Sequence, residues 1–106
     1  PDERHIRYED VRQIKKVIER FKPDVVNAHF ATGYGWLAKR AVRKDGPQIV
    51  LHLWGSDILQ VPHKSIFHRM KAKAALKSAS IVIGDSLYLL EEAANFGLPA
   101  RKQRLR

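Results

Sequence analysis

Side chains that could bind a polar ligand follow a short apolar run in the middle of the chain. The run Ile49–Leu53 stops abruptly, and Trp54, Gly55, Ser56 and Asp57 come directly after it. In open α/β sheets, ligands bind where loops leave the carboxyl ends of parallel strands. The sequence therefore predicts a buried strand that leads into a binding loop. A turn in which Ser56 or Asp57 only caps the next helix explains the same residues.

Two other expected strands end in comparable side chains. The segment 23–30 has the composition of a buried strand with His29 at or just past its tip. Asp85 and Ser86 follow the strand expected at 79–84. A lone histidine is more often structural than catalytic, and Asp85 and Ser86 can cap the next helix. Both interpretations stay open from the residues alone.

Two glycines precede the second helix. Gly33, Tyr34 and Gly35 come just before the helix expected at 36–43. Glycines at the start of a helix allow backbone amides to approach an anion. The pattern is much shorter than a dinucleotide or P-loop fingerprint, and tight packing of the loop on the strand accounts for it as well.

The elements that position these residues alternate between helix and strand. Short connections between them predict an α/β fold, a three-layer Rossmann-like fragment whose short parallel sheet has helices on both faces. One edge of a three-stranded sheet stays unpaired, and a second copy of the chain could pair with it. Residues 1–106 are expected to form one partial domain, with about 101–106 as a frayed basic tail. Apolar spacing predicts helices at 8–21, 36–43, 65–78 and 87–96 and strands at 23–30, 49–53 and 79–84.

Each expected helix has an apolar side that we expect to be buried. In the first helix this side consists of Val11, Ile14, Val17, Ile18 and Phe21. In the helix at 65–78 it consists of Ile66, Phe67, Met70, Ala74 and Ala75.

The chain is strongly basic. Lys and Arg number 20 against 11 Asp and Glu, which gives a net charge of +9. Such a balance favours a polyanionic partner: nucleic acid, an anionic membrane surface or phosphorylated substrates. No acidic residue lies between Asp57 and Asp85. The candidate membrane or phosphate contacts within that stretch are Lys64, Arg69, Lys71, Lys73 and Lys77, and a solvated helix face is the alternative.

The composition excludes several classes of site. The chain has no cysteine, so disulfides, thiolate metal sites and a cysteine nucleophile are excluded. This composition is compatible with a cytoplasmic protein. No apolar run approaches the roughly 20 residues of a membrane-spanning helix, so any membrane contact is expected to be peripheral.

Four segments, in this order, resemble the amino-terminal domain of a family 4 glycosyltransferase. They read KPDVVNAHF at 22–30, YGWLA at 34–38, WGSDI at 54–58 and ALKSASIVIGDS at 75–86. No single segment is diagnostic, but their order and spacing agree with the family from about Tyr8 to Pro99.

The resemblance implies a GT-B architecture, in which two Rossmann-like domains face each other across a cleft. It implies transfer of a sugar from an activated donor, usually a nucleotide sugar, with retention at the anomeric carbon and no metal or other cofactor. The amino-terminal domain of such an enzyme mainly holds the acceptor, which can be lipid-linked. The chain is then expected to be the later part of that domain. It would be inactive without the carboxyl-terminal donor domain and would act in the cytoplasm or at the cytoplasmic face of a membrane.

One residue departs from the family pattern. Many relatives carry histidine where this chain has Trp54, and that histidine helps to bind the donor sugar. A tryptophan side chain cannot shuttle protons or accept a hydrogen bond. We expect Trp54 to pack under the loop or to shape the cleft, although its ring could stack on a sugar. The sequence assigns the vacant role to neither His29 nor His52, and His52 has the weaker claim because it belongs to the strand.

The sequence predicts candidate substrate-binding residues but assigns no catalytic residue. The alternative function is a basic, non-enzymatic module that binds nucleic acid or an anionic membrane surface. Its aromatic residues favour a core or a cleft over a platform for stacking bases. The substrate-binding candidates are His29, Gly33, Tyr34, Gly35, Trp54, Gly55, Ser56, Asp57, Asp85 and Ser86.

Overall fold

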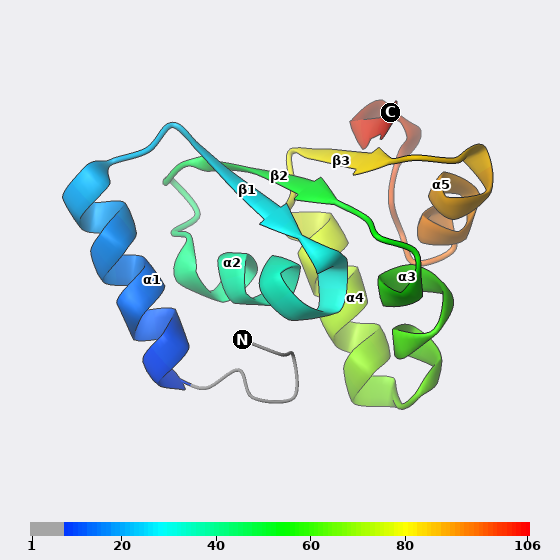
Figure 1. The fold of residues 1–106 in the computed structure, drawn as a ribbon, viewed down its shortest axis with the longest axis horizontal. Helices are drawn as coiled ribbons and strands as arrows, with labels where there is room; N and C mark the ends of the chain where they lie inside the picture. The colour runs from blue at the N-terminus through cyan, green and yellow to red at the C-terminus, as the bar shows by residue number, and fades with distance from the viewer. Residues whose placement is uncertain (1–7) are drawn as a thin grey trace.

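The structure, a computed structural model, describes residues 8–106 as alternating helices and strands (Figure 1). Residues 1–7 of the expected domain lie outside the described part. Segment η2 is a π-helix, and η3 and η4 are short 3₁₀ helices. The elements are α1 Tyr8–Phe21, β1 Val25–His29, η2 Phe30–Gly35, α2 Trp36–Ala41, β2 Gln48–His52, α3 Ser56–Leu59, η3 Val61–His63, α4 Ile66–Ser78, β3 Ile81–Gly84, α5 Leu87–Ala94, η4 Ala100–Lys102 and β4 Gln103–Leu105.

The strands form one parallel sheet in the order β1-β2-β3-β4. This confirms the predicted α/β class and the Rossmann-like parallel sheet. The prediction of a frayed tail at 101–106 was wrong, because part of this segment forms β4. Ile83 of β3 is in register with Arg104, and the backbone amide of Arg106 donates to the carbonyl oxygen of Gly84 at 2.9 Å. Charged residues are common on edge strands, so the basic composition concealed a strand.

The arrangement of the layers differs from the prediction in one respect. Within residues 8–106, the helices that connect the strands cover one face of the sheet, as Figure 1 shows for α2 and α4. The strand order advances in a single direction, and right-handed crossovers then place every connecting helix on the same side. Strand residues therefore alternate in burial: Ile49 and Leu51 of β2 are buried, whereas Val50 and His52 are partly exposed.

The helix layer packs on the sheet mainly through small side chains. Ala72, Ala75 and Leu76 form the buried side of α4, so the prediction for this helix was correct for Ala75. It was wrong for Ile66, Phe67 and Met70, which are exposed. Alanines let α4 lie close to η2 and α2, and the larger residues at the start of the helix point elsewhere.

The first helix is buried along only part of its predicted stripe. Val11 is buried, and Ile14 and Ile18 pack against Leu37 and Ala41 of α2. The other two predicted core residues, Val17 and Phe21, are exposed. No helix among residues 8–106 has both the length and the apolar character needed to cross a membrane.

Gly35 lies where η2 packs against the centre of the sheet. A Cβ atom on Gly35 would lie 2.8 Å from Cδ1 of Leu51 and 3.3 Å from the carbonyl oxygen of Phe30. Leu51 is completely buried, so it has little room to move. The close approach of loop and strand therefore explains this glycine.

We expect Gly35→Ala to lower the free energy of unfolding by about 1–3 kcal/mol, because it overpacks the core. This loss would occur although alanine favours a helix by about 1 kcal/mol over glycine. Urea unfolding would measure it. Leu51→Val removes the nearest methyl group, so the cost of Gly35→Ala should shrink in the double variant. Equal costs in both backgrounds would contradict the proposed contact.

Candidate functional site

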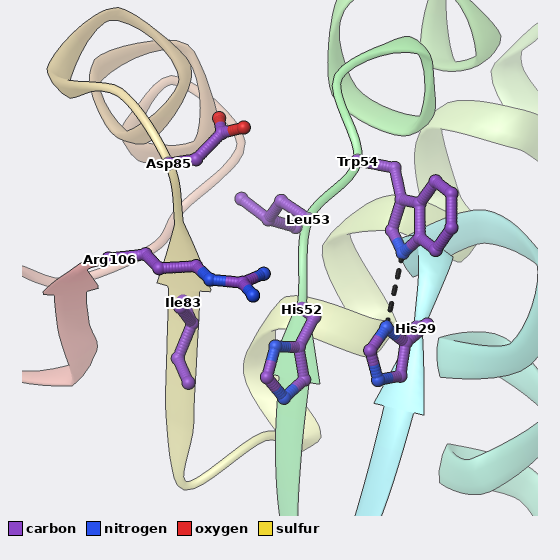
Figure 2. A pocket seen from close by; sticks show the side chains of 7 residues that line it. All are labelled: His29, His52, Leu53, Trp54, Ile83, Asp85 and Arg106. Atoms are coloured by element: carbon purple, nitrogen blue, oxygen red, sulfur yellow. Dashed lines mark hydrogen bonds between the residues drawn. The ribbon is translucent and has the colours of Figure 1, made fainter.

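A pocket of about 240 Å³ lies at the carboxyl ends of β1, β2 and β3, on the side of the sheet away from the helices (Figure 2). This is the edge at which parallel α/β sheets bind ligands. Each of the three strands ends at or is followed by a polar or aromatic residue, so the sequence predicted such side chains at this edge. The lining residues are His29, His52, Leu53, Trp54, Ile83, Asp85 and Arg106.

Three aromatic side chains form the centre of the pocket. The rings of His29 and His52 are stacked, with centroids 4.3 Å apart and planes 3° from parallel. The register explains this contact, because His29 of β1 pairs directly with His52 of β2. Trp54 meets the edge of His29 at a centroid distance of 6.0 Å. Its indole Nε1–H donates a hydrogen bond to Nδ1 of His29 at 3.3 Å, drawn as the dashed line in Figure 2.

These hydrogen bonds determine which nitrogen atoms carry protons. Because Nδ1 of His29 accepts from Trp54, a neutral His29 carries its proton on Nε2. Nε2 of His52 lies 3.3 Å from the side-chain oxygen Oδ1 of Asn27, which can only accept a hydrogen bond. His52 therefore also carries its proton on Nε2. Nε2 of His29 is therefore the ring atom that can donate to a ligand, whereas Nε2 of His52 is already engaged with Asn27.

The surroundings of His52 favour its neutral form. Burial lowers the pKa of His52, and the nearby His29 and Arg106 lower it further. Figure 2 shows the guanidinium of Arg106 reaching across Ile83 toward His52. Asp85, just after β3, lies on the side of Leu53 away from Trp54 and supplies a carboxylate. The pocket thus combines a guanidinium, a carboxylate and two imidazole rings, a set of groups that can hydrogen-bond a polar ligand.

Asp57 fixes the loop that carries Trp54. Its side chain is completely buried. Oδ2 accepts from the backbone amide of Ala31 at 2.8 Å, and Oδ1 accepts from the amides of Trp54 and Gly55 at 3.0 and 2.9 Å. Burial raises the pKa of Asp57, and these hydrogen bonds offset part of that rise. Both oxygens are engaged with the protein, so Asp57 positions the loop and does not face a ligand.

The backbone on both sides of the pocket adopts uncommon conformations. Gly55 has φ 119°, a value that side-chain-bearing residues rarely adopt, so glycine is required after Trp54. Phe30, directly after His29, has φ 77° although it is not a glycine. Strained residues of this kind cluster at functional sites.

A known protein family and a known protein match parts of this sequence. Residues 3–86 match the family model described as glycosyl transferase 4-like. The chain belongs to this family. It is 44% identical over 73 residues to TuaC of Bacillus subtilis (strain 168), whose name provisionally assigns it as a glycosyltransferase of teichuronic acid biosynthesis. The match covers 67% of this chain and 18% of TuaC, so the chain spans a small part of that relative.

The structure brings together only some of the predicted site residues of this family member. His29, Trp54 and Asp85 line the pocket, and Gly55 shapes the loop. Ser86 caps α5 by accepting from the amide of Leu89 at 3.1 Å. The predicted residues Gly33, Tyr34, Gly35, Ser56, Asp57 and Ser86 do not line the pocket, and the basic residues Lys64, Arg69, Lys71, Lys73 and Lys77 lie on or before α4.

Trp54 is not packed under its loop, which was one of the two expectations for it. The side chain is 67% exposed, so its ring forms a wall of the pocket. This agrees with the other expectation, that Trp54 shapes the cleft.

Sequence reasoning missed two polar lining residues, Arg106 and His52, besides the apolar Leu53 and Ile83. Arg106 reaches the pocket only because β4 exists, and no apolar run marked that strand. His52 had the weaker claim because it lies in a strand, yet its alternation with Leu51 places it on the face opposite the core. That alternation was the available signal. Within the described part of the chain, no group of three or more His, Asp or Glu side chains could hold a metal ion.

We expect Asp57→Asn to lower the free energy of unfolding by about 1–3 kcal/mol, because an amide accepts through only one oxygen and leaves a buried N–H unpaired. Urea unfolding would measure this loss. The matched control is Asp45→Asn, at an exposed carboxylate 3.5 Å from Nε of Arg43, which should change little. A loss no larger than that of the control would contradict the positioning role.

The pH dependence of the loss follows from the raised pKa of Asp57. A raised pKa means that the folded state binds the proton more tightly than the unfolded state, whose carboxyl titrates near its ordinary value of 3.8. The contribution of Asp57 to stability is then greatest below that value and declines as the pH rises through the folded-state pKa. The stability gap between the wild type and Asp57→Asn should therefore narrow from acid to neutral pH.

Proposed function

We propose that this chain is the acceptor-side part of a retaining glycosyltransferase that takes its sugar from an activated donor, most simply a nucleotide sugar. Membership of the glycosyl transferase 4-like family supports the reaction class. The observation that carries the proposal is the pocket in which Trp54 orients His29 at the strand tips. Donor and acceptor hydroxyl groups would meet there.

The size of the pocket supports a role in binding one sugar unit. Its volume of about 240 Å³ lies below the range of about 300–1,000 Å³ that is typical of sites for drug-sized ligands. A whole nucleotide sugar would need more room and further phosphate-binding groups. Among the described residues that line the pocket, Arg106 is the only arginine or lysine, so most of the leaving diphosphate would be bound by another part of the enzyme.

Each polar residue of the pocket has a distinct part in the proposed chemistry. His29 donates its Nε2–H to a sugar hydroxyl, and Trp54 holds the ring in the tautomer that can do so. Asp85 accepts hydrogen bonds from hydroxyl groups. Arg106 offers a positive charge to the developing anion. Trp54 thus supports, through His29, the sugar contact that a histidine would make in its place.

The proposal also explains why the chain alone should be inactive. Sugar transfer needs a site that holds the leaving diphosphate and excludes water. The pocket has one arginine and no lysine among its described lining residues, and it opens on the side of the sheet that no helix among residues 8–106 covers. We therefore expect turnover from the full-length protein and none from residues 1–106 alone.

We expect His29→Ala in the full-length protein to lower kcat/KM about 10- to 100-fold, because a hydrogen-bond donor to the sugar is lost. Trp54→Phe keeps an aromatic ring but removes the indole N–H, so it should lower kcat/KM about 3- to 10-fold. The measurement is nucleotide release from a panel of nucleotide sugars in the presence of acceptor. Tyr88→Phe, on the exposed side of α5, is the control and should be neutral.

Two results would contradict the proposal. Full activity of both pocket variants would remove His29 and Trp54 from the site. A product with an inverted anomeric centre, read by NMR, would exclude the retaining reaction.

A further inference from the structure

The outer side of α4 begins with three large apolar side chains that nothing in the described structure covers. Ile66 is 70% exposed, Phe67 is 72% exposed and Met70 is 60% exposed. Exposed apolar residues are ordinary when scattered, but a contiguous group marks an interaction site. These three lie within one helical turn of each other, so they form such a group.

Cations continue the same side of the helix. Lys73 and Lys77 follow Ile66 at seven and eleven residues, spacings that place them on one helical face with Ile66 and Met70. Both lysines are exposed. We call Ile66, Phe67, Met70, Lys73 and Lys77 the α4 outer face. Its apolar start and basic end are separated by about 16 Å, at 1.5 Å per residue.

Side chains next to the α4 outer face add positive charge. No acidic residue lies between Asp57 and Asp85, so this stretch of the sequence adds no negative charge. Arg69 lies 5.6 Å from the ring of Phe96, and Lys71 lies 6.0 Å from the ring of Trp36. Lys39 and Arg40 of α2 lie over the same Trp36 ring. The α4 outer face therefore belongs to a basic surface formed by two adjacent helices.

We propose that the α4 outer face binds the surface of an anionic lipid bilayer. Ile66, Phe67 and Met70 would enter the boundary between headgroups and acyl chains, and the lysines would contact lipid phosphates. Amphipathic helices bind membranes through this combination of apolar area and positive charge. Nucleic acid fits less well, because it is bound by charge and by aromatic stacking rather than by exposed aliphatic side chains.

The α4 outer face and the pocket lie on opposite sides of the sheet, because α4 packs on the sheet through Ala75 and Leu76 whereas His52 points to the other side. A bilayer bound at α4 would therefore leave the pocket accessible. The binding does not require sugar transfer, so it can be tested without donor or acceptor.

The experiment measures binding of the full-length protein to vesicles by co-sedimentation. The vesicles contain phosphatidylcholine alone or phosphatidylcholine with phosphatidylglycerol. We expect binding only with the anionic lipid. Phe67→Gln should weaken binding about tenfold, and each of Lys73→Gln and Lys77→Gln should weaken it about fivefold.

Matched controls lie on α1. Phe21 is 70% exposed, close to the value for Phe67, and Lys15 and Lys16 are exposed lysines. Phe21→Gln and Lys16→Gln should leave binding unchanged. Salt separates the two parts of the α4 outer face, because high ionic strength screens the lysines and not the apolar contact. The loss from Lys73→Gln should disappear at high salt, and the loss from Phe67→Gln should remain.

Several results would overturn the proposal. Equal binding to neutral and anionic vesicles, or equal losses from the α4 and α1 variants, would remove the role of this face. A change in self-association without a change in vesicle binding would make a second copy its partner. Salt-sensitive RNA binding that displaces the vesicles would make nucleic acid the partner. Unchanged unfolding midpoints would confirm that each variant is folded.

Discussion

The buried carboxylate of Asp57 connects the two loops that form the pocket. It accepts hydrogen bonds from Ala31, which follows β1, and from Trp54 and Gly55, which follow β2. Burying a carboxylate is costly, and the raised pKa of Asp57 reflects that cost. Three backbone amides compensate for much of it. The arrangement holds the tips of two parallel strands in a fixed relation, so His29 and Trp54 can meet.

This arrangement fixes the backbone of residue 54 without using its side chain. The backbone amide of Trp54 is held by Asp57, whereas the indole is free to contact His29. The positive φ of Gly55 turns the chain immediately afterwards, whatever side chain precedes it. The same loop is therefore compatible with different side chains at this position. In this chain the indole N–H donates to His29, and it can donate but cannot accept.

Much of the fold could be predicted because a buried strand shows as an apolar run and a helix shows as apolar residues at helical spacing. The strands at 23–30, 49–53 and 79–84 and the helix at 8–21 were found close to their observed bounds. Periodicity identifies a helix, but it does not show what the helix packs against. The apolar start of α4 was therefore assigned to the core, whereas Ala72, Ala75 and Leu76 hold that position. The strand β4 depends on backbone pairing with β3, which a basic sequence does not reveal.

The site was predicted in part for a similar reason. Residues after a strand are visible in the sequence as a change from apolar to polar, which identified His29, Trp54 and Asp85. Contacts between strands depend on register, and register is a property of the folded sheet. The stacking of His29 on His52 and the approach of Arg106 both arise in this way. Asp57 was predicted to bind substrate because it lies in the loop after β2. Both of its carboxylate oxygens instead accept hydrogen bonds from backbone amides of the protein.

The hydrogen bonds of the pocket decide which ring atoms a ligand can reach. Burial lowers the pKa of His52, and His29 and Arg106 lower it further, which favours the neutral form of that ring. Nε2 of His52 already faces Oδ1 of Asn27, and Nδ1 of His29 accepts from the indole of Trp54. A neutral His29 then carries its donor on Nε2, where a polar ligand can accept from it. The pocket is therefore suited to positioning a ligand by hydrogen bonds.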